Sequence, residues 1–264
     1  MLPVFYLFLA ELRRDVRAWW SYRVQALSSL ALWLVAFPFM MATFDGVAGG
    51  YGAERQLASL IGFLVWELCA GVLAATTESV TTEARQGTLE SVILAPVPPL
   101  LTFSLRLTAV FTRQAVETLV LGLGLALLLG LYMTPGGLAL LVALLTLLGV
   151  AGLGLALGGL ALVYKSVDSV VAVVSLLAVL FTGALVPLND LGLVFTLLKL
   201  LLPITWGIDL LRQTLIGGAT WSHLWASGAL PGLGLQSAVF LALGIVVFRW
   251  GLSRAQEQGS LGSY

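Results

Sequence analysis

Six long apolar stretches constrain what this 264-residue chain can fold into. An α-helix needs about 20 mostly apolar residues to cross the hydrocarbon of a bilayer. The stretches are Ala26–Phe44, Leu57–Thr77, Leu107–Met133, Leu138–Val163, Val167–Val186 and Gly228–Phe248. Only 10% of the residues are charged, whereas a soluble domain has about 25%. The sequence therefore predicts an all-α integral membrane protein with six transmembrane helices.

A seventh apolar stretch, Leu191–Leu215, contains two features that oppose a simple span. Lys199, Asp209 and Arg212 place charges within it, and Pro203 interrupts it. A charge at the centre of a membrane helix costs about 2.5–3.5 kcal/mol on insertion scales. We therefore predict an outer re-entrant helix pair within residues 186–218, broken near Pro203 and placed before the last span.

The distribution of Lys and Arg predicts the orientation of the chain. With the N-terminus inside, the outer segments hold only Arg55, Lys199 and Arg212. The inner segments hold Arg13, Arg14, Arg17, Arg23, Arg85, Arg106, Arg113, Lys165, Arg249 and Arg254. Because basic residues concentrate on the cytoplasmic side, we expect both termini to be cytoplasmic. The start of the sequence is also a poor signal peptide, so we expect the N-terminus to be retained.

The first 24 residues predict an amphipathic interfacial helix, mainly over Pro3–Tyr22. Apolar side chains recur at helical spacing, while Glu11, Arg14 and Asp15 fall on another face. Such a helix lies along a membrane surface. Two roles remain open for it, a simple anchor and a connecting helix that transmits force.

The segment "TTEARQGTLESVILAPVPP" between the second and third spans predicts a short helix over Glu83–Ala95. Thr81 or Thr82 can cap its start, and the prolines that follow prevent the helix from continuing. Gly87 leaves space for the backbone of a partner. The helix is either a docking element for a cytosolic protein or an ordinary inter-span helix on the membrane surface.

This segment resembles the first cytoplasmic loop of the ABC-2 type transporter permease family. The resemblance lies in the pattern E-x-x-x-G-T-L-E, followed by apolar residues and P-V-P. The outer segment "LVPLND…LLPITWGIDLLRQTL" is similar to that family as well. The resemblance implies one transmembrane domain over residues 1–264, with an N-terminal connecting helix, a coupling helix and a re-entrant pair.

The resemblance also implies a function and a set of partners. It predicts the membrane subunit of an ATP-driven exporter in the bacterial inner membrane, with two permease copies, as a homodimer or heterodimer, and two copies of a separate ATPase. ATP and magnesium would be bound by that ATPase. The cargo would be hydrophobic or amphiphilic: a drug, a lipid or a lipid-linked saccharide. The residues implied in ATPase coupling are Glu83, Arg85, Gln86, Gly87, Thr88, Leu89 and Glu90.

Several other functions lack their motifs in this sequence. Neither Lys165 nor Lys199 follows a glycine, so the chain has no P-loop and is not itself the ATPase. His223 has no second ligand for a metal site, and Cys69 has no cysteine to pair with. The balanced charge suggests no nucleic-acid partner. A secondary transporter, or a membrane assembly protein without ATP coupling, remains the alternative.

Polar and aromatic residues within the spans supply the remaining candidates. Glu67 lies near the middle of the second predicted span, and Arg113 and Glu117 are one helical turn apart and can pair. Glu67 is either satisfied structurally or contacts cargo or a gate. Three aromatic residues, Trp33, Phe37 and Trp66, are possible members of a transport path. Small residues near Gly154 and Gly158, a G-x-x-x-G pattern, predict close helix packing within the domain.

Overall fold

The computed structural model describes residues 2–48, 52–85, 94–131, 136–164, 172, 173, 175, 176 and 202–257. These residues form eight helices and contain no strand. The helices are α1 (Leu2–Ser21), α2 (Arg23–Ala48), α3 (Ala53–Arg85), α5 (Pro99–Leu129), α6 (Gly137–Tyr164), α9 (Pro203–Leu215), α10 (Trp221–Ala226) and α11 (Ala229–Glu257). The prediction of an all-α membrane protein is confirmed at this level.

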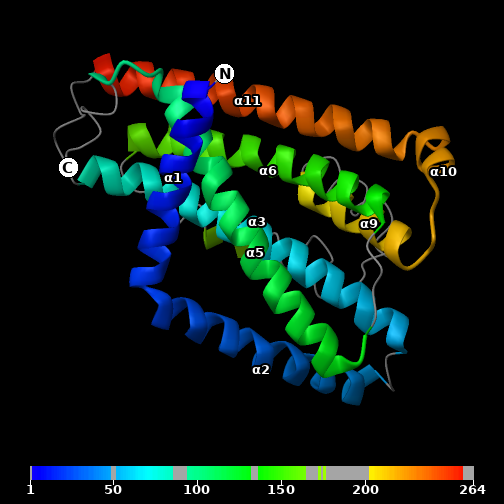
Figure 1. Cartoon of the computed structure of the whole chain (residues 1–264). Coiled ribbons are helices and arrows are strands. Elements are labelled where there is room, and N and C mark those ends of the chain that lie inside the picture. Colours follow the sequence, from blue (N-terminus) through cyan, green and yellow to red (C-terminus); the bar gives the residue numbers. More distant parts are fainter. Residues whose placement is uncertain are drawn as a thin grey trace.

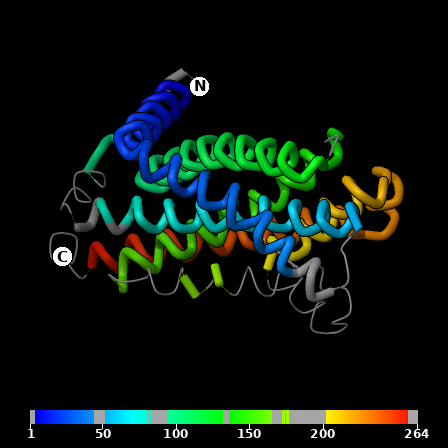
Figure 2. Tube along the Cα trace, turned by 90° about the horizontal axis from the view of Figure 1, so that it is seen from below, coloured from blue at the N-terminus to red at the C-terminus, as the bar shows by residue number. Residues whose placement is uncertain are grey.

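The long helices run back and forth between two ends of a bundle, and α1 lies across one of them (Figure 1). At this end, which we call the α1 end, α2 and α5 begin and α3, α6 and α11 end. The short helices α9 and α10 lie toward the opposite end. Figure 2 shows from below that α1 is inclined to the long helices α3 and α11.

Five of the helices are long and apolar enough to cross a membrane. The candidate spans are Arg23–Thr43, Ala53–Val80, Pro99–Leu129, Gly137–Tyr164 and Ala229–Glu257. Each contains most of one predicted stretch, so five of the six predicted spans correspond to observed helices. The predicted span Val167–Val186 lies almost wholly outside the described residues and stays a prediction.

The helix boundaries differ from the predicted ones at the α1 end. Helix α3 continues without a break from its apolar part through Glu83 to Arg85. Thr81 and Thr82 therefore lie inside α3, and the prediction that one of them caps the start of a new helix is wrong. The backbone hydrogen bonds of α3 continue past its last apolar residue. Helix α5 begins at Pro99, eight residues before the predicted Leu107, since proline suits the first helical position, where no N–H partner is needed.

Helix α6 is the centre of the bundle and packs against α3, α9 and α11. Its closest neighbour is α11, where a Cβ atom on Gly244 would overlap the carbonyl oxygen of Gly152. A Cβ on Gly251 would likewise overlap the carbonyl oxygen of Gly159. Two glycine pairs, seven residues apart on each helix, thus allow the two backbones to touch, as small residues do in membrane helices.

The predicted G-x-x-x-G pattern serves a different contact. A Cβ on Gly154 would lie 3.3 Å from the Thr76 hydroxyl oxygen of α3, and one on Gly158 would lie 3.5 Å from a methyl of Val80. These are ordinary or slightly tight side-chain contacts. The prediction of packing inside the domain is confirmed, but the closest approach uses the neighbouring Gly152 and Gly159.

The described part of the predicted re-entrant segment is α9. Pro203 occupies its first turn, as expected from a break near this residue. The Arg212 guanidinium donates a hydrogen bond to the backbone carbonyl of Ala58 in α3, at 2.8 Å. Burial of this basic residue is thus compensated by a neighbouring helix. Residues 186–201 lie outside the described residues, so the re-entrant pair stays a prediction.

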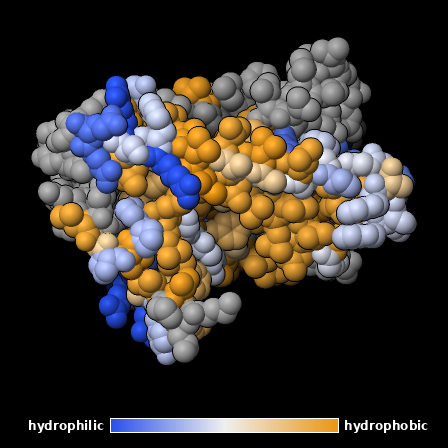
Figure 3. Space-filling view, turned by 90° about the horizontal axis from the view of Figure 1, so that it is seen from above, coloured by the Kyte–Doolittle hydropathy of each residue, from blue (hydrophilic) through white to orange (hydrophobic). Residues whose placement is uncertain are grey.

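The surface has the layering expected of a membrane protein. Seen from above, hydrophobic residues cover the middle, the most hydrophilic residues gather at the α1 end, and weakly polar residues gather at the opposite end (Figure 3). Apolar side chains such as Leu119, Leu127 and Leu243 are exposed on the long helices. A contiguous apolar surface of this kind is suited to lipid or to another protein.

Candidate functional site

The amphipathic helix α1 is joined to α5 by two ion pairs. Glu11 contacts the Arg106 guanidinium at 3.2 Å, and Asp15 contacts the Arg113 guanidinium at 2.6 Å. The acidic residues are four apart on α1, and the arginines are seven apart on α5, so each pair lies on one face of its helix. The Arg106 side chain is only 7% exposed. Helix α1 is therefore fixed to α5 by buried and half-buried charges.

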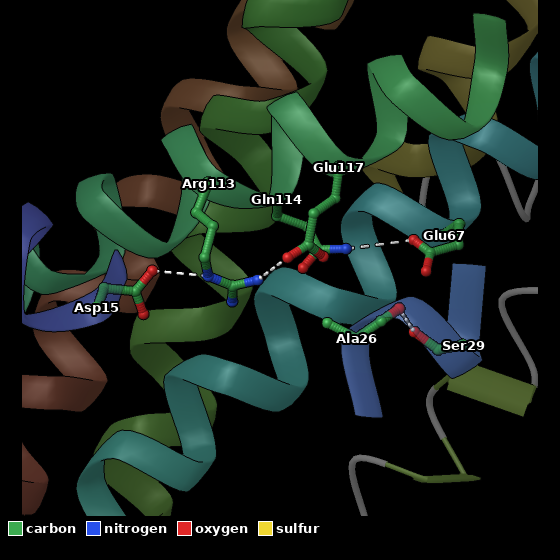
Figure 4. Close-up of polar contacts among 7 residues, drawn as sticks. All are labelled: Asp15, Ala26, Ser29, Glu67, Arg113, Gln114 and Glu117. Carbon is green, nitrogen blue, oxygen red and sulfur yellow. Dashed lines mark hydrogen bonds and ion pairs between the residues drawn. The ribbon is translucent and has the colours of Figure 1, made fainter. Parts of the chain in front are cut away.

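Arg113 connects α1 with the interior of the bundle. Its guanidinium donates to Asp15 of α1 and also to Glu117, one turn further along α5, at 2.5 Å. Figure 4 shows Arg113 between these two carboxylates. The predicted pairing of Arg113 and Glu117 is confirmed. The contact of Arg113 with Asp15 was not predicted. Because of this contact, the positive charge of Arg113 is shared between carboxylates on α1 and α5.

Gln114, the residue after Arg113, makes a separate contact from α5 to α3. Its side-chain amide donates to the Glu67 carboxylate, with 3.3 Å between Nε2 and Oε2 (Figure 4). The Gln114 side chain is buried, and it rests on Gly71, where a Cβ would come within 2.5 Å of its amide carbon. Gly71 lies one turn from Glu67 on α3. The absence of a side chain at Gly71 therefore makes the space in which Gln114 reaches Glu67.

Two separate sets of polar contacts therefore meet on α5, Asp15–Arg113–Glu117 and Gln114–Glu67, and we call these five residues the polar network. The first set reaches α1 and the second reaches α3, and the neighbouring residues Arg113 and Gln114 belong one to each. A Ser or Thr on a neighbouring helix could satisfy a carboxylate at this position, but the structure shows another donor to Glu67. The observed donor is an amide, which the sequence did not single out because glutamine in an apolar helix gives no motif.

The aromatic candidates lie together between α2 and α3. The Trp33 ring packs edge to face against Phe63 and Trp66, with centroids 5.0 and 6.0 Å away. The Phe37 ring is fully buried, 4.7 Å from Phe63. Trp66 also donates through its indole nitrogen to the backbone carbonyl of Ser175, at 3.1 Å. We call Trp33, Phe37, Phe63 and Trp66 the aromatic cluster; whether it lines a transport path stays a prediction.

The ATPase-coupling candidates are only partly within the described residues. Glu83 and Arg85 lie in the last turn of α3. Gln86, Gly87, Thr88, Leu89 and Glu90 lie outside the described residues. The chain resumes at Leu94, near the start of α5 at Pro99. Both flanks of the segment are thus at the α1 end, on the same side as the described ion pairs.

The described polar residues make contacts between helices. In the described part of the chain, no group of three or more His, Cys, Asp or Glu is arranged to hold a metal ion. Cys69 is buried. The hydrogen bonds of the polar network join α5 to α1 and, separately, α5 to α3, and charge-assisted hydrogen bonds are directional and strong at low dielectric.

The comparison with protein families gives one match. Residues 6–216 match the family model described as ABC-2 type transporter, which covers most of the chain and runs from α1 to the end of α9. A comparison with curated proteins finds no match. The matched region contains the polar network, the aromatic cluster and the segment between α3 and α5.

Proposed function

Because this chain belongs to the ABC-2 type transporter family, a family of multi-pass membrane proteins, we propose that it is the permease subunit of an ATP-driven exporter. The family match over residues 6–216 is the observation that carries this proposal. The chain itself would not hydrolyse ATP, since it has no P-loop. ATP and magnesium would be bound by a separate ATPase, present in two copies.

The proposed orientation places the α1 end at the cytoplasmic face of the bacterial inner membrane. This agrees with the concentration of hydrophilic residues at that end (Figure 3) and with the excess of Lys and Arg in the segments assigned to it. Both termini would be cytoplasmic. Two permease copies would enclose the path for a hydrophobic or amphiphilic cargo.

The segment between α3 and α5 is the proposed docking element for the ATPase. Since α3 is helical to Arg85 and includes Glu83, a movement of the segment that follows Arg85 would pass directly into the membrane-crossing part of α3. The rigid start of α5, with Pro98 before it and Pro99 in its first turn, would transmit the same movement to α5. The polar network would then pass it to α1.

The test combines ATPase co-purification with transport. We expect the triple variant Glu83→Lys, Glu90→Lys, Gly87→Trp to lose ATPase binding, because charge reversal disturbs the rim of the contact and the indole blocks close approach. A matched control, Gln256→Trp with Glu257→Lys, makes a similar change at exposed positions near the end of α11. The control should bind the ATPase as the wild type does.

The outcomes separate the proposed function from its alternatives. If the triple variant kept full ATPase binding and full transport, the segment would have no role in coupling. Transport by the purified chain without any ATPase would instead indicate a secondary transporter. If no ATPase co-purifies and no transport occurs, the chain would be better described as a membrane assembly protein.

A further inference from the structure

The charges around Glu67 do not balance among the described residues. Arg113 is the one base within the polar network, and it already contacts the carboxylates of Asp15 and Glu117. Glu67 receives a single neutral N–H, from Gln114, and forms no ion pair within the described part of the chain. A carboxylate in this position inside a membrane protein is costly unless a cation or a proton compensates it. The site can therefore accept one further positive charge.

Glu67 lies deeper in the bundle than the ion pairs that hold α1. Gln114, its donor, is adjacent in sequence to Arg113, which is bound to α1. Glu67 itself is midway along the candidate span Ala53–Val80, about one helical turn further from the α1 end than Gly71, on which Gln114 rests. With α1 on the membrane surface, a ligand would have to place its charged end below the head groups to reach this carboxylate.

Aromatic rings lie on the side of Glu67 that is further from the α1 end. Phe63 lies one turn before Glu67 on α3, on the side away from the α1 end. Its ring is 5.0 Å from Trp33 and 5.9 Å from Trp66, measured between centroids. Phe63 is fully buried, whereas Trp33 and Trp66 are half-buried and leave part of their surface open. Exposed indole surface can contact an apolar body and also attracts cations.

An unpartnered hydroxyl lies at the same level. The contacts of Gly71 with Gln114 and of Gly122 with Leu64 define an antiparallel register between α3 and α5. This register brings Thr118 to the level of Glu67. The Thr118 hydroxyl oxygen is buried and has no hydrogen-bond partner in the described part of the chain. Buried hydroxyls normally have a partner, so this position can supply a further contact to a polar ligand.

From these observations we propose that Glu67 binds the positively charged nitrogen of an amphiphilic substrate, an organic ammonium ion whose apolar body lies along Trp33 and Trp66. This inference rests on the proposed function, since it names the class of cargo carried by the same subunit. The carboxylate would recognise the charge, and the aromatic surface would accept rings or chains of varied shape. The proposed site thus selects for charge more than for detailed shape.

The experiment uses two fluorescent probes with the same apolar body. One is 4-(1-pyrenyl)butylamine, which is positively charged at neutral pH, and the other is its neutral N-acetyl derivative. The full chain is placed in lipid nanodiscs without an ATPase, and binding is measured by energy transfer from tryptophan to pyrene, with empty nanodiscs as the blank. We expect the wild type to prefer the amine. Glu67→Gln should weaken amine binding by about tenfold, as for loss of one charge-assisted contact, and leave the neutral probe unchanged.

Two further variants make the result specific. Glu78→Gln removes another carboxylate from α3, eleven residues away and on nearly the same face, and should leave the preference intact. Glu67→Asp keeps the charge and should retain part of the preference, with a thermal midpoint measured for every variant to confirm folding.

Three results would overturn the proposal: equal loss of both probes in Glu67→Gln, unchanged amine binding in that variant, or no preference for the amine in the wild type. Because binding is measured without an ATPase, these results are independent of whether ATP coupling is correct.

Discussion

At the scale of single residues, glycine determines how closely α6 and α11 pack. Gly152 and Gly159 on α6 face Gly244 and Gly251 on α11, and no side chain separates the two backbones. The spacing of seven residues places each pair on one face of its helix. Gly234 of α11 has no such role, since a Cβ there would meet no atom within 4 Å. Position therefore matters more than the number of glycines.

This difference predicts opposite effects for the same substitution at two positions. Gly244→Ala should lower the free energy of unfolding by about 1–3 kcal/mol, because the new methyl overlaps the backbone of α6. Gly234→Ala should be neutral or stabilising by up to about 1 kcal/mol, since alanine favours helix more than glycine does. The measurement is the thermal midpoint of each purified variant in detergent. Equal midpoints for the two variants would contradict the packing argument.

At the scale of helices, the sequence predicted which membrane-spanning helices exist better than it predicted which side chains contact one another between helices. Runs of apolar residues are a property of the chain itself, so the five described spans were identifiable from their length. The pairing of Arg113 with Glu117 was also predictable, because both lie on one helix at a fixed spacing. The contacts of Arg113 with Asp15 and of Gln114 with Glu67 were not, because the residues are 98 and 47 positions apart. Only the packed arrangement of the helices brings them together.

The contact between α1 and α5 should depend on its half-buried ion pairs. Asp15→Asn keeps the size of the side chain but removes the charge that Arg113 contacts, leaving that guanidinium less well paired. We expect a loss of about 1–2 kcal/mol in stability, allowing for partial exposure. Hydrogen exchange should become faster at the amides of α1, while the amides of α6 should change little, since α6 lies at the centre of the bundle.

A surface pair provides the control for this prediction. Arg254 and Glu257 form an exposed ion pair on α11, with 3.1 Å between the nitrogen and the oxygen. Because exposed pairs contribute little, Glu257→Gln should leave both stability and exchange in α1 unchanged. If Asp15→Asn behaved in the same way, the Asp15–Arg113 pair would not be what holds α1 to α5.

At the scale of the whole molecule, α2 is the candidate span that the rest of the chain covers least. Only 11% of its most apolar stretch is buried, compared with 50% for α3 and α6. In Figure 1 it runs along the edge of the bundle. Leu32, Val35 and Phe39 are exposed at spacings of three and four residues, so they form an apolar stripe. This stripe faces either lipid or a second copy of the chain.

The proposed two-fold assembly predicts that the α2 stripe meets its own copy. In a symmetric dimer, residues near the axis contact the same residues of the partner. Val35→Cys, in a Cys69→Ser background, should therefore cross-link to a dimer under mild oxidation in membranes. Leu123→Cys is the matched control, since Leu123 is equally apolar and exposed but lies on α5. Cross-linking at Leu123 without cross-linking at Val35 would move the contact to α5. Absence of any dimer, by cross-linking and by the mass of the purified complex, would contradict a path formed between two copies.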